Sequence, residues 1–292
     1  NTKGLTHMKF KIQPTNVTFG AIVSGIHLSQ LTSDLLDDIK EAFLKYALLI
    51  FPGQNLSSKE QVEFAKLFGE IEYLVDNMET IPLSNRSSNG RIMSDEEEQI
   101  KLLKGNEIWH TDSSYMPRAS KASVLSAKII PEFGGQTEWA DARAAYDSLE
   151  KHMREKIDTL NATHNYFVSQ AKIGHQVKVG AAYGFYEGEP PIYPLVKIHP
   201  ETNRPALYVG RHACNIIGMP EDESEELLQF LNAQIVKSQF VWQHSWSPGD
   251  IAIWDNRCLL HRARPFDSSK ERLMMHTRIR GNKISETALN YR

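Results

Sequence analysis

The sequence has little cysteine and no long apolar run. Cys214 and Cys258 are the only two cysteines among 292 residues. A disulfide framework is therefore excluded as the basis of the fold, and a reducing cytoplasm is expected. No apolar stretch approaches the roughly 20 residues of a membrane helix, and the start has no apolar core of a secretory signal. We therefore predict a cytoplasmic protein that does not associate with membranes.

A strong charge of one sign is absent too. The formal net charge is −3, and lysines and arginines form no basic stripe, so no nucleic-acid partner is expected. The acidic run at 95–98 is interpreted as a solvated loop rather than a metal site. Because internal repeats and low-complexity linkers are also missing, we predict one domain over residues 8–283. Residues 1–7 would be a tag or a disordered start, and residues 284–292 a C-terminal tail.

Local patterns predict both helices and strands. The spacing of apolar residues favours helices over 33–46, 141–153 and 221–235 and strands over 48–51, 122–130 and 272–279. Short strands separated by Gly and Pro turns, with few helices, are typical of a jelly roll with flanking helices. The expected class is therefore α+β. Two stretches, 70–105 and the irregular 166–195, are candidates for lids over a site.

One short motif points to a metal. His110-Thr111-Asp112 is the only His-x-Asp in the chain, and on a strand its first and third side chains would share one face. A distant third ligand would complete the two-His-one-carboxylate arrangement of non-haem Fe(II) oxygenases. Two of the open positions would suit a chelating 2-oxo acid and the third O2. The similar pair in His199-Pro200-Glu201 is interpreted as a tight turn instead.

The third ligand is sought in the C-terminal part of the chain. His261 follows a predicted strand and the polar group Asp255-Asn256-Arg257, which can orient a metal ligand. One face of the last predicted strand carries Arg272, Met274, His276 and Arg278. Arginine binds carboxylates through a bidentate fork, so this face suits an anionic ligand. A solvent-facing edge strand is the alternative interpretation.

At these residues the sequence resembles the taurine dioxygenase family of Fe(II)/2-oxoglutarate-dependent enzymes, and within it the branch containing 2,4-dichlorophenoxyacetate dioxygenase. The resemblance extends from about Phe19 to Gly281. It is densest in Trp109-His110-Thr111-Asp112-Ser113-Ser114, Leu125-Ser126-Ala127, Gly134-Gly135-Gln136-Thr137-Glu138-Trp139, Arg143-Ala144-Ala145-Tyr146 and Trp254 to His261. It implies a double-stranded β-helix (jelly roll) core with flanking helices.

The resemblance also implies which residues bind metal and cosubstrate. His110, Asp112 and His261 match the iron ligands of the family. Thr137 and Arg272 match the pair that binds the C5 carboxylate of 2-oxoglutarate. These residues are expected to be the catalytic and cofactor-binding set, with Fe(II), 2-oxoglutarate and O2 as cofactor and cosubstrates.

Substrate contacts follow from the resemblance with one departure. Asn106 matches an asparagine that lines the substrate pocket of the taurine enzyme. The family's substrate-anion arginine falls four residues after the cosubstrate arginine, and here that position is His276. Arg278 lies on the same face of the predicted strand and could take its place. The choice between His276 and Arg278 stays open from the sequence.

The expected activity is hydroxylation of a small anionic substrate of aryloxyalkanoate, sulfonate or alkyl sulfate type, followed by oxidative cleavage of the product. One alternative is a hydroxylase or desaturase of a larger biosynthetic metabolite that uses the same iron site. Another is a non-catalytic metal-binding jelly roll, against which Thr137 and Arg272 argue, because a structural metal needs no cosubstrate contacts. A homodimer or homotetramer is a further expectation from the family.

Overall fold

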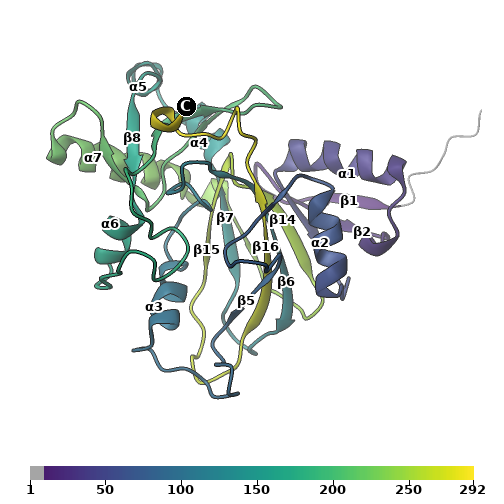
Figure 1. The fold of residues 1–292 in the computed structure, drawn as a ribbon. Coiled ribbons are helices and arrows are strands. Elements are labelled where there is room, and N and C mark those ends of the chain that lie inside the picture. The colour runs from purple at the N-terminus through teal and green to yellow at the C-terminus, as the bar shows by residue number, and fades with distance from the viewer. Residues whose placement is uncertain (1–9) are drawn as a thin grey trace, which may run out of the picture.

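The computed structural model describes residues 10–292, and helices flank a central group of strands on two sides (Figure 1). The start predicted for residues 1–7 lies outside the described residues. The helices are α1 (Ser33–Tyr46), α2 (Ser58–Lys66), α3 (Glu98–Gly105), α4 (Ala142–Ser148), α5 (Lys151–Ile157), α6 (Tyr166–Ala171) and α7 (Glu221–Ile235). Short 3-10 helices are η1 (Leu28–Gln30), η2 (Ser238–Phe240) and η3 (Leu289–Tyr291).

The strands form one large sheet and three smaller ones. They are β1 (Lys11–Pro14), β2 (Ala21–Ser24), β3 (Leu48–Phe51), β4 (Ile71–Glu72), β5 (Ile81–Ser84), β6 (Ser120–Ile129), β7 (Thr137–Asp141), β8 (Asn161–His164), β9 (Ile192–Pro194), β10 (Val196–Ile198), β11 (Pro205–Leu207), β12 (Ala213–Ile216), β13 (Val241–His244), β14 (Ile251–Asp255), β15 (Leu259–Ala263) and β16 (Leu273–Arg280). The large sheet has the order β1-β2-β3-β14-β6-β16-β4, with β5 also paired to β16. A second sheet has the order β13-β7-β15.

Strand β14 shows how the sequence divides the core. Ala252 and Trp254 pack in one apolar cluster with Trp139 of β7, whereas Ile253 packs in another with Phe43 of α1. Successive side chains of a strand point to opposite faces, which produces this division. The ring centroids of Trp139 and Trp254 lie 5.6 Å apart. One core therefore joins the two sheets, and the other joins the large sheet to α1 and α2.

Local signals define the ends of the first two helices. The side chain of Thr32 accepts a hydrogen bond at the start of α1, and Ala47 adopts a left-handed φ of 62° at its end. Ser57 and Glu60 form a reciprocal capping box at the start of α2. These contacts satisfy helix-end groups that would otherwise lack partners. Helix α1 accordingly has the predicted bounds, 33–46.

Two predictions of local structure are wrong. The helix expected over 141–153 is divided, because Leu149 takes an extended conformation (φ −69°, ψ 146°) between α4 and α5. Its side chain is buried there, and packing therefore overrides the local preference for one helix. The stretch 166–195 is not wholly irregular, since it contains α6, which Asn165 caps, and β9, which pairs with β8.

The predicted C-terminal tail packs against the rest of the protein. The side chain of Glu286 is buried and forms an ion pair with buried Lys197. Ala288 is also buried, and the side chain of Asn290 accepts a hydrogen bond of 2.9 Å from the backbone of Ile192. Residues 284–292 therefore do not extend away from the body of the protein.

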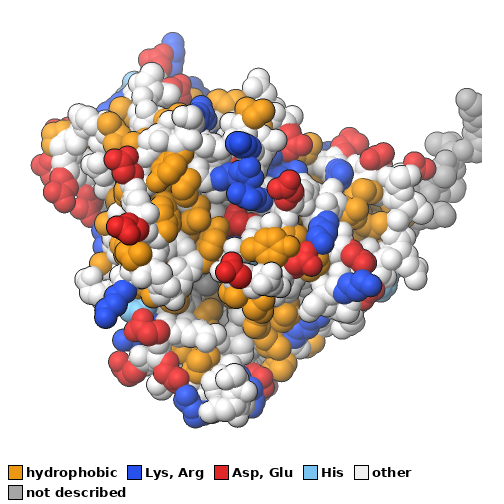
Figure 2. Space-filling model, in the orientation of Figure 1, with side chains coloured by type: hydrophobic (Ala, Val, Ile, Leu, Met, Phe, Trp, Pro, Cys, Tyr) orange, Lys and Arg blue, Asp and Glu red, His pale blue; other side chains and the backbone are white. Residues whose placement is uncertain are grey.

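No helix within residues 10–292 is long and apolar enough to cross a membrane. On the face drawn in Figure 2, most acidic and basic side chains lie in separate small groups between apolar ones. One compact group of Lys and Arg side chains lies near the upper middle of that view.

Candidate metal and cosubstrate site

His110 and His261 lie side by side because their backbones pair. The N–H of His110 donates to the carbonyl of His261 at 3.0 Å, and the reciprocal bond measures 2.8 Å. His110 and Asp112 do not lie on one strand, which was the condition for their sharing one face. The chain turns at Ser113, which has a φ of 61°. The two side chains therefore do not share a strand face, and a turn brings the carboxylate to the two imidazoles instead.

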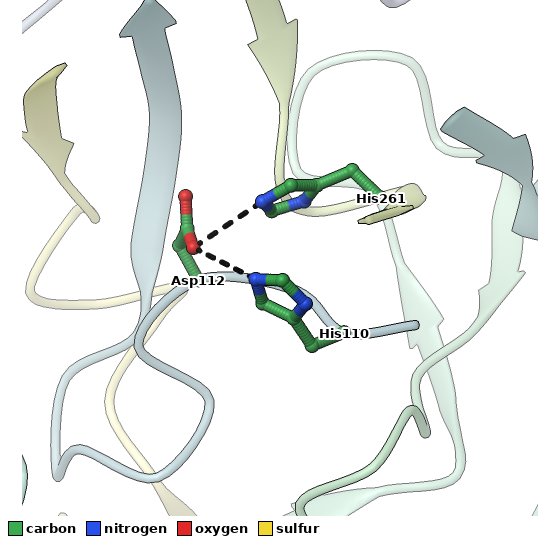
Figure 3. A group of neighbouring side chains, drawn as sticks. All are labelled: His110, Asp112 and His261. Carbon is green, nitrogen blue, oxygen red and sulfur yellow. Dashed lines mark ion pairs between the residues drawn. The ribbon is translucent and has the colours of Figure 1, made fainter. Parts of the chain in front are cut away.

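The three side chains face a common point (Figure 3). The Oδ1 atom of Asp112 lies 3.7 Å from Nε2 of His110 and 3.5 Å from Nε2 of His261. All three residues are buried, and their ligand atoms lie within 4.8 Å of one another. Two imidazoles and one carboxylate with this convergence form the donor set of a non-haem Fe(II) site.

Neighbouring groups orient these donors. The carbonyl of Ile108 can only accept, so Nδ1 of His110, 2.7 Å away, carries the proton and Nε2 keeps its lone pair. The Oδ2 atom of Asp112 accepts a hydrogen bond of 2.6 Å from Ser123, which in turn accepts one of 2.9 Å from Asn256. Such outer contacts fix the direction of metal ligands. Asn256 belongs to the polar group that the sequence suggested for this task.

The charges of the donors also suit a cation. Burial and the nearby His261 lower the pKa of His110 to about 3, so its ring is neutral at pH 7. Burial by itself raises the pKa of Asp112, but Arg278 and His261 outweigh it and hold the pKa well below its usual range. Metal binding requires a neutral imidazole and an ionised carboxylate, which His110 and Asp112 supply.

Arg272 is a buried cation without an acidic partner among the described residues. Its side chain donates to the carbonyl of Gly135 at 3.0 Å, while its Nε atom is buried and has no partner in residues 10–292. Burial lowers its pKa to about 10, which still leaves it charged at pH 7. An unpaired buried charge is costly. The position therefore suits a bound carboxylate.

Thr137 lies in the same cavity as Arg272. Its Oγ1 atom accepts a hydrogen bond of 2.9 Å from the indole N–H of Trp246. Because this bond occupies an acceptor position of Oγ1, the hydroxyl proton of Thr137 is available for another acceptor. A hydroxyl donor and a guanidinium together fit the distal carboxylate of 2-oxoglutarate.

A cavity of about 160 Å³ extends from the donor set toward solvent. Its apolar wall consists of Leu74, Ile81, Leu83, Met93, Ile100, Leu103, Leu125, Trp254, Ala263 and Phe266. Asn106, at the end of α3, also lines it. Most of this wall comes from the predicted lid 70–105, whereas the other predicted lid, 166–195, contributes no lining residue.

Both candidate substrate anchors line the cavity, but their other contacts differ. His276 lines the cavity, and burial together with Arg278 lowers its pKa to about 3, so it is neutral at pH 7. Arg278 lies with its Nη2 atom 3.4 Å from Oδ1 of Asp112. The edge-strand interpretation is wrong, because β16 lies between β6 on one side and β4 and β5 on the other.

Several groups around the site were not found from the sequence. Ser123, Trp246 and Glu72 come from separate segments, and the site joins them through hydrogen bonds. No spacing or motif connects such residues, because the fold alone brings them together.

Comparisons with known proteins agree with this fold and donor set. Residues 10–278 match the model of the family described as "Taurine catabolism dioxygenase TauD, TfdA family". The chain belongs to this family, and it is an α-ketoglutarate-dependent dioxygenase. The predicted α+β fold with a double-stranded β-helix core is thereby confirmed. The predicted dependence on 2-oxoglutarate and on a metal is also confirmed.

Individual relatives cover almost the whole chain. An "(S)-phenoxypropionate/alpha-ketoglutarate-dioxygenase" of Sphingobium herbicidovorans is 46% identical over 96% of this chain and 98% of its own. A 2,4-dichlorophenoxyacetate dioxygenase of Cupriavidus pinatubonensis is 33% identical over 91% of this chain and 96% of its own. The solved structure "AAD-2 in complex with Mn(II) and N-oxalylglycine" aligns with a TM-score of 0.88 and 32% identity, covering 96% of this chain and 99% of that one.

Proposed function

We propose that the protein hydroxylates small aryloxyalkanoates at the carbon that bears the ether oxygen. The buried Arg272, which has no acidic partner in residues 10–292, supports 2-oxoglutarate-dependent hydroxylation, because with Thr137 it gives the apolar cavity a binding end for the C5 carboxylate of 2-oxoglutarate. The similarity to enzymes for phenoxypropionate and 2,4-dichlorophenoxyacetate supports the substrate class. The hydroxylated ether would then release a phenol and leave a 2-oxo acid.

Each residue would have a separate task. His110, Asp112 and His261 would hold Fe(II), and Thr137 and Arg272 the C5 carboxylate of 2-oxoglutarate. Bound Fe(II) would supply the oxidation of a substrate C–H bond by O2, and 2-oxoglutarate would be converted to succinate and CO2. The apolar wall would bind the aryl ring and exclude water, and Asn106 and His276 would contact the polar end of the substrate.

The location and assembly stay predictions. Both cysteines are free thiols, which supports the proposal of a reducing cytoplasm. A homodimer or homotetramer rests on the family alone.

The decisive experiment follows succinate and phenol together. Wild-type protein with Fe(II), 2-oxoglutarate and each enantiomer of phenoxypropionate should form both products in equal amounts. His110→Ala and Asp112→Ala should abolish both, whereas His152→Ala, which changes an exposed histidine, should not. Succinate formation without phenol, from an alkyl sulfate or sulfonate instead, would assign a different substrate class.

A further inference from the structure

A buried charged cluster adjoins the Asp112 carboxylate. It contains two acids, one cation and three hydroxyl groups: Asp112, Glu72, Arg278, Ser113, Tyr115 and Tyr183. The side chains of Glu72 and Arg278 are 5% and 9% exposed. A buried charge is stable only where its surroundings compensate it, so each contact here constrains the position of Arg278.

Most hydrogen-bonding positions of Arg278 are directed at neighbours within the protein. Its Nη2 atom lies 3.4 Å from Oδ1 of Asp112. Its Nη1 donates to the hydroxyls of Ser113 at 3.1 Å and Tyr115 at 3.4 Å. Its Nε donates to Nε2 of His276 at 3.3 Å. One guanidinium therefore joins Asp112 to His276, and both Arg278 and His276 line the cavity.

Glu72 holds the other side of this guanidinium. Its Oε2 atom lies 3.9 Å from Nη1 of Arg278 and accepts hydrogen bonds from Ser113 and, at 2.8 Å, from Tyr183. Tyr183 comes from the predicted lid 166–195, which lines no part of the cavity. This segment therefore contacts the charged cluster through the hydrogen bond from Tyr183 to Glu72.

We propose that Arg278 is a positioning residue that holds the carboxylate of Asp112 and the ring of His276, with Glu72 as its counter-ion. The proposal rests on the proposed function for the roles of Asp112 and His276. Arg278 then does not anchor the substrate anion. Because Nε2 of His276 accepts from Arg278, the neutral ring carries its proton on Nδ1. His276 would offer this N–H to the substrate as a hydrogen-bond donor.

Metal binding without any substrate separates positioning from anchoring. Mn(II) is titrated into the metal-free wild type and into Arg278→Gln and Arg278→Lys, with 2-oxoglutarate and substrate absent. Loss of an outer contact to a metal ligand weakens metal binding by about 10- to 100-fold, and this is expected for Arg278→Gln. Arg278→Lys keeps the charge and should recover part of the affinity.

Steady-state kinetics and Mn(II) binding together would reveal an Arg278 that anchors the substrate instead. If Arg278 bound the substrate anion, Arg278→Gln would bind Mn(II) like the wild type, while KM for the aryloxyalkanoate rose at least tenfold with kcat unchanged. That result would overturn the proposal. Arg143→Gln is the matched control, because Arg143 is equally buried and pairs with Asp141. It should leave the affinity for Mn(II) unchanged.

A milder variant covers the case in which neither Arg278 variant folds. Glu72→Gln keeps the shape of the side chain and removes only the counter-ion, so it should weaken Mn(II) binding at least threefold. Unchanged binding in a folded Glu72→Gln variant would also overturn the proposal. The proposed function fails separately, if the wild type binds Mn(II) but forms no succinate with Fe(II), 2-oxoglutarate and any aryloxyalkanoate.

Discussion

The guanidinium of Arg272 has few partners within the described residues. Its buried guanidinium bonds to one backbone carbonyl and to no acid among residues 10–292. Arg272→Gln should raise KM for 2-oxoglutarate about 10- to 100-fold, since a charge-assisted hydrogen bond contributes roughly 1.5–3 kcal/mol. The unfolding temperature of the ligand-free protein should stay the same or rise, because the substitution removes an uncompensated buried charge.

The control for Arg272 is another arginine near the site. Arg262 on β15 pairs with Glu138 and lines no part of the cavity, so Arg262→Gln should leave KM for 2-oxoglutarate unchanged. Steady-state succinate assays and thermal unfolding measure both quantities. A marked loss of thermal stability in Arg272→Gln would show that the arginine supports the fold rather than the cosubstrate.

His164 should make the protein sensitive to acid. Burial, and then Lys197, lower its pKa to about 3, whereas the unfolded chain takes up the proton near pH 6.5. Between these values the unfolded state holds one more proton, so the free energy of unfolding falls as the pH decreases, by up to about 1.4 kcal/mol per pH unit. Above pH 6.5 this contribution to stability is complete.

His164→Gln removes that titration. Urea unfolding of the metal-free protein between pH 7 and 4 should show a shallower dependence on pH for the variant than for the wild type. His152→Gln, which changes an exposed histidine, should leave the slope unaltered. Equal slopes for wild type and His164→Gln would mean that the buried ring is protonated in the folded protein.

At the scale of elements, α3 forms part of the wall of the cavity. Ile100 and Leu103 of this helix both line it. Leu103→Trp should lower kcat/KM for ring-substituted aryloxyalkanoates at least tenfold, because a cavity of about 160 Å³ cannot take the larger side chain and the substrate together. KM for 2-oxoglutarate should not change, since its site lies at Thr137 and Arg272.

Val179 provides the comparison for this wall. It is exposed, belongs to the stretch 166–195 and does not line the cavity. Val179→Trp should therefore leave the preference among aryloxyalkanoates unaltered. If both tryptophan variants changed that preference equally, the substrate would bind elsewhere than in the cavity beside α3.

Helices with signals at their own ends could be predicted from the sequence. The turn at Ser113, next to the metal-ligand candidate Asp112, could not. The ends of α1 depend on Thr32 and Ala47, which lie in the segment itself. The approach of Asp112 to His261 depends on a left-handed Ser113 and on a backbone pair between residues far apart in the chain. Residue spacing carries no record of such long-range contacts. The motif could suggest His110 and Asp112 as candidates, but their joining with His261 was predictable only through the family resemblance.

The same limit explains the substrate anchor. Sequence alternation on β16 correctly places His276 and Arg278 on one face, since both contact the site. It does not reveal that Glu72, from β4, lies against Arg278. Whether a charge is free for a ligand depends on what the rest of the fold places beside it.

For the whole molecule, the C-terminal segment is part of the stable body. The carboxylate of Glu286 pairs with Lys197, whose ammonium also lies 4.2 Å from the ring centroid of Tyr208. Breaking a buried pair by removing one partner leaves an uncompensated charge and costs about 3–5 kcal/mol. Glu286→Ala should therefore lower the free energy of unfolding by about that amount in a urea titration.

A double substitution separates this charge effect from simple packing. Lys197→Met combined with Glu286→Leu replaces both charges by apolar groups, and such replacements of buried pairs are often neutral or stabilising. The double variant should therefore be more stable than Glu286→Ala. If Glu286→Ala cost less than about 1 kcal/mol, residues 284–292 would be a detachable tail, as the sequence suggested. A loss of about 3–5 kcal/mol in Glu286→Ala, and the recovery of that stability in the double variant, would show that the last nine residues complete the fold.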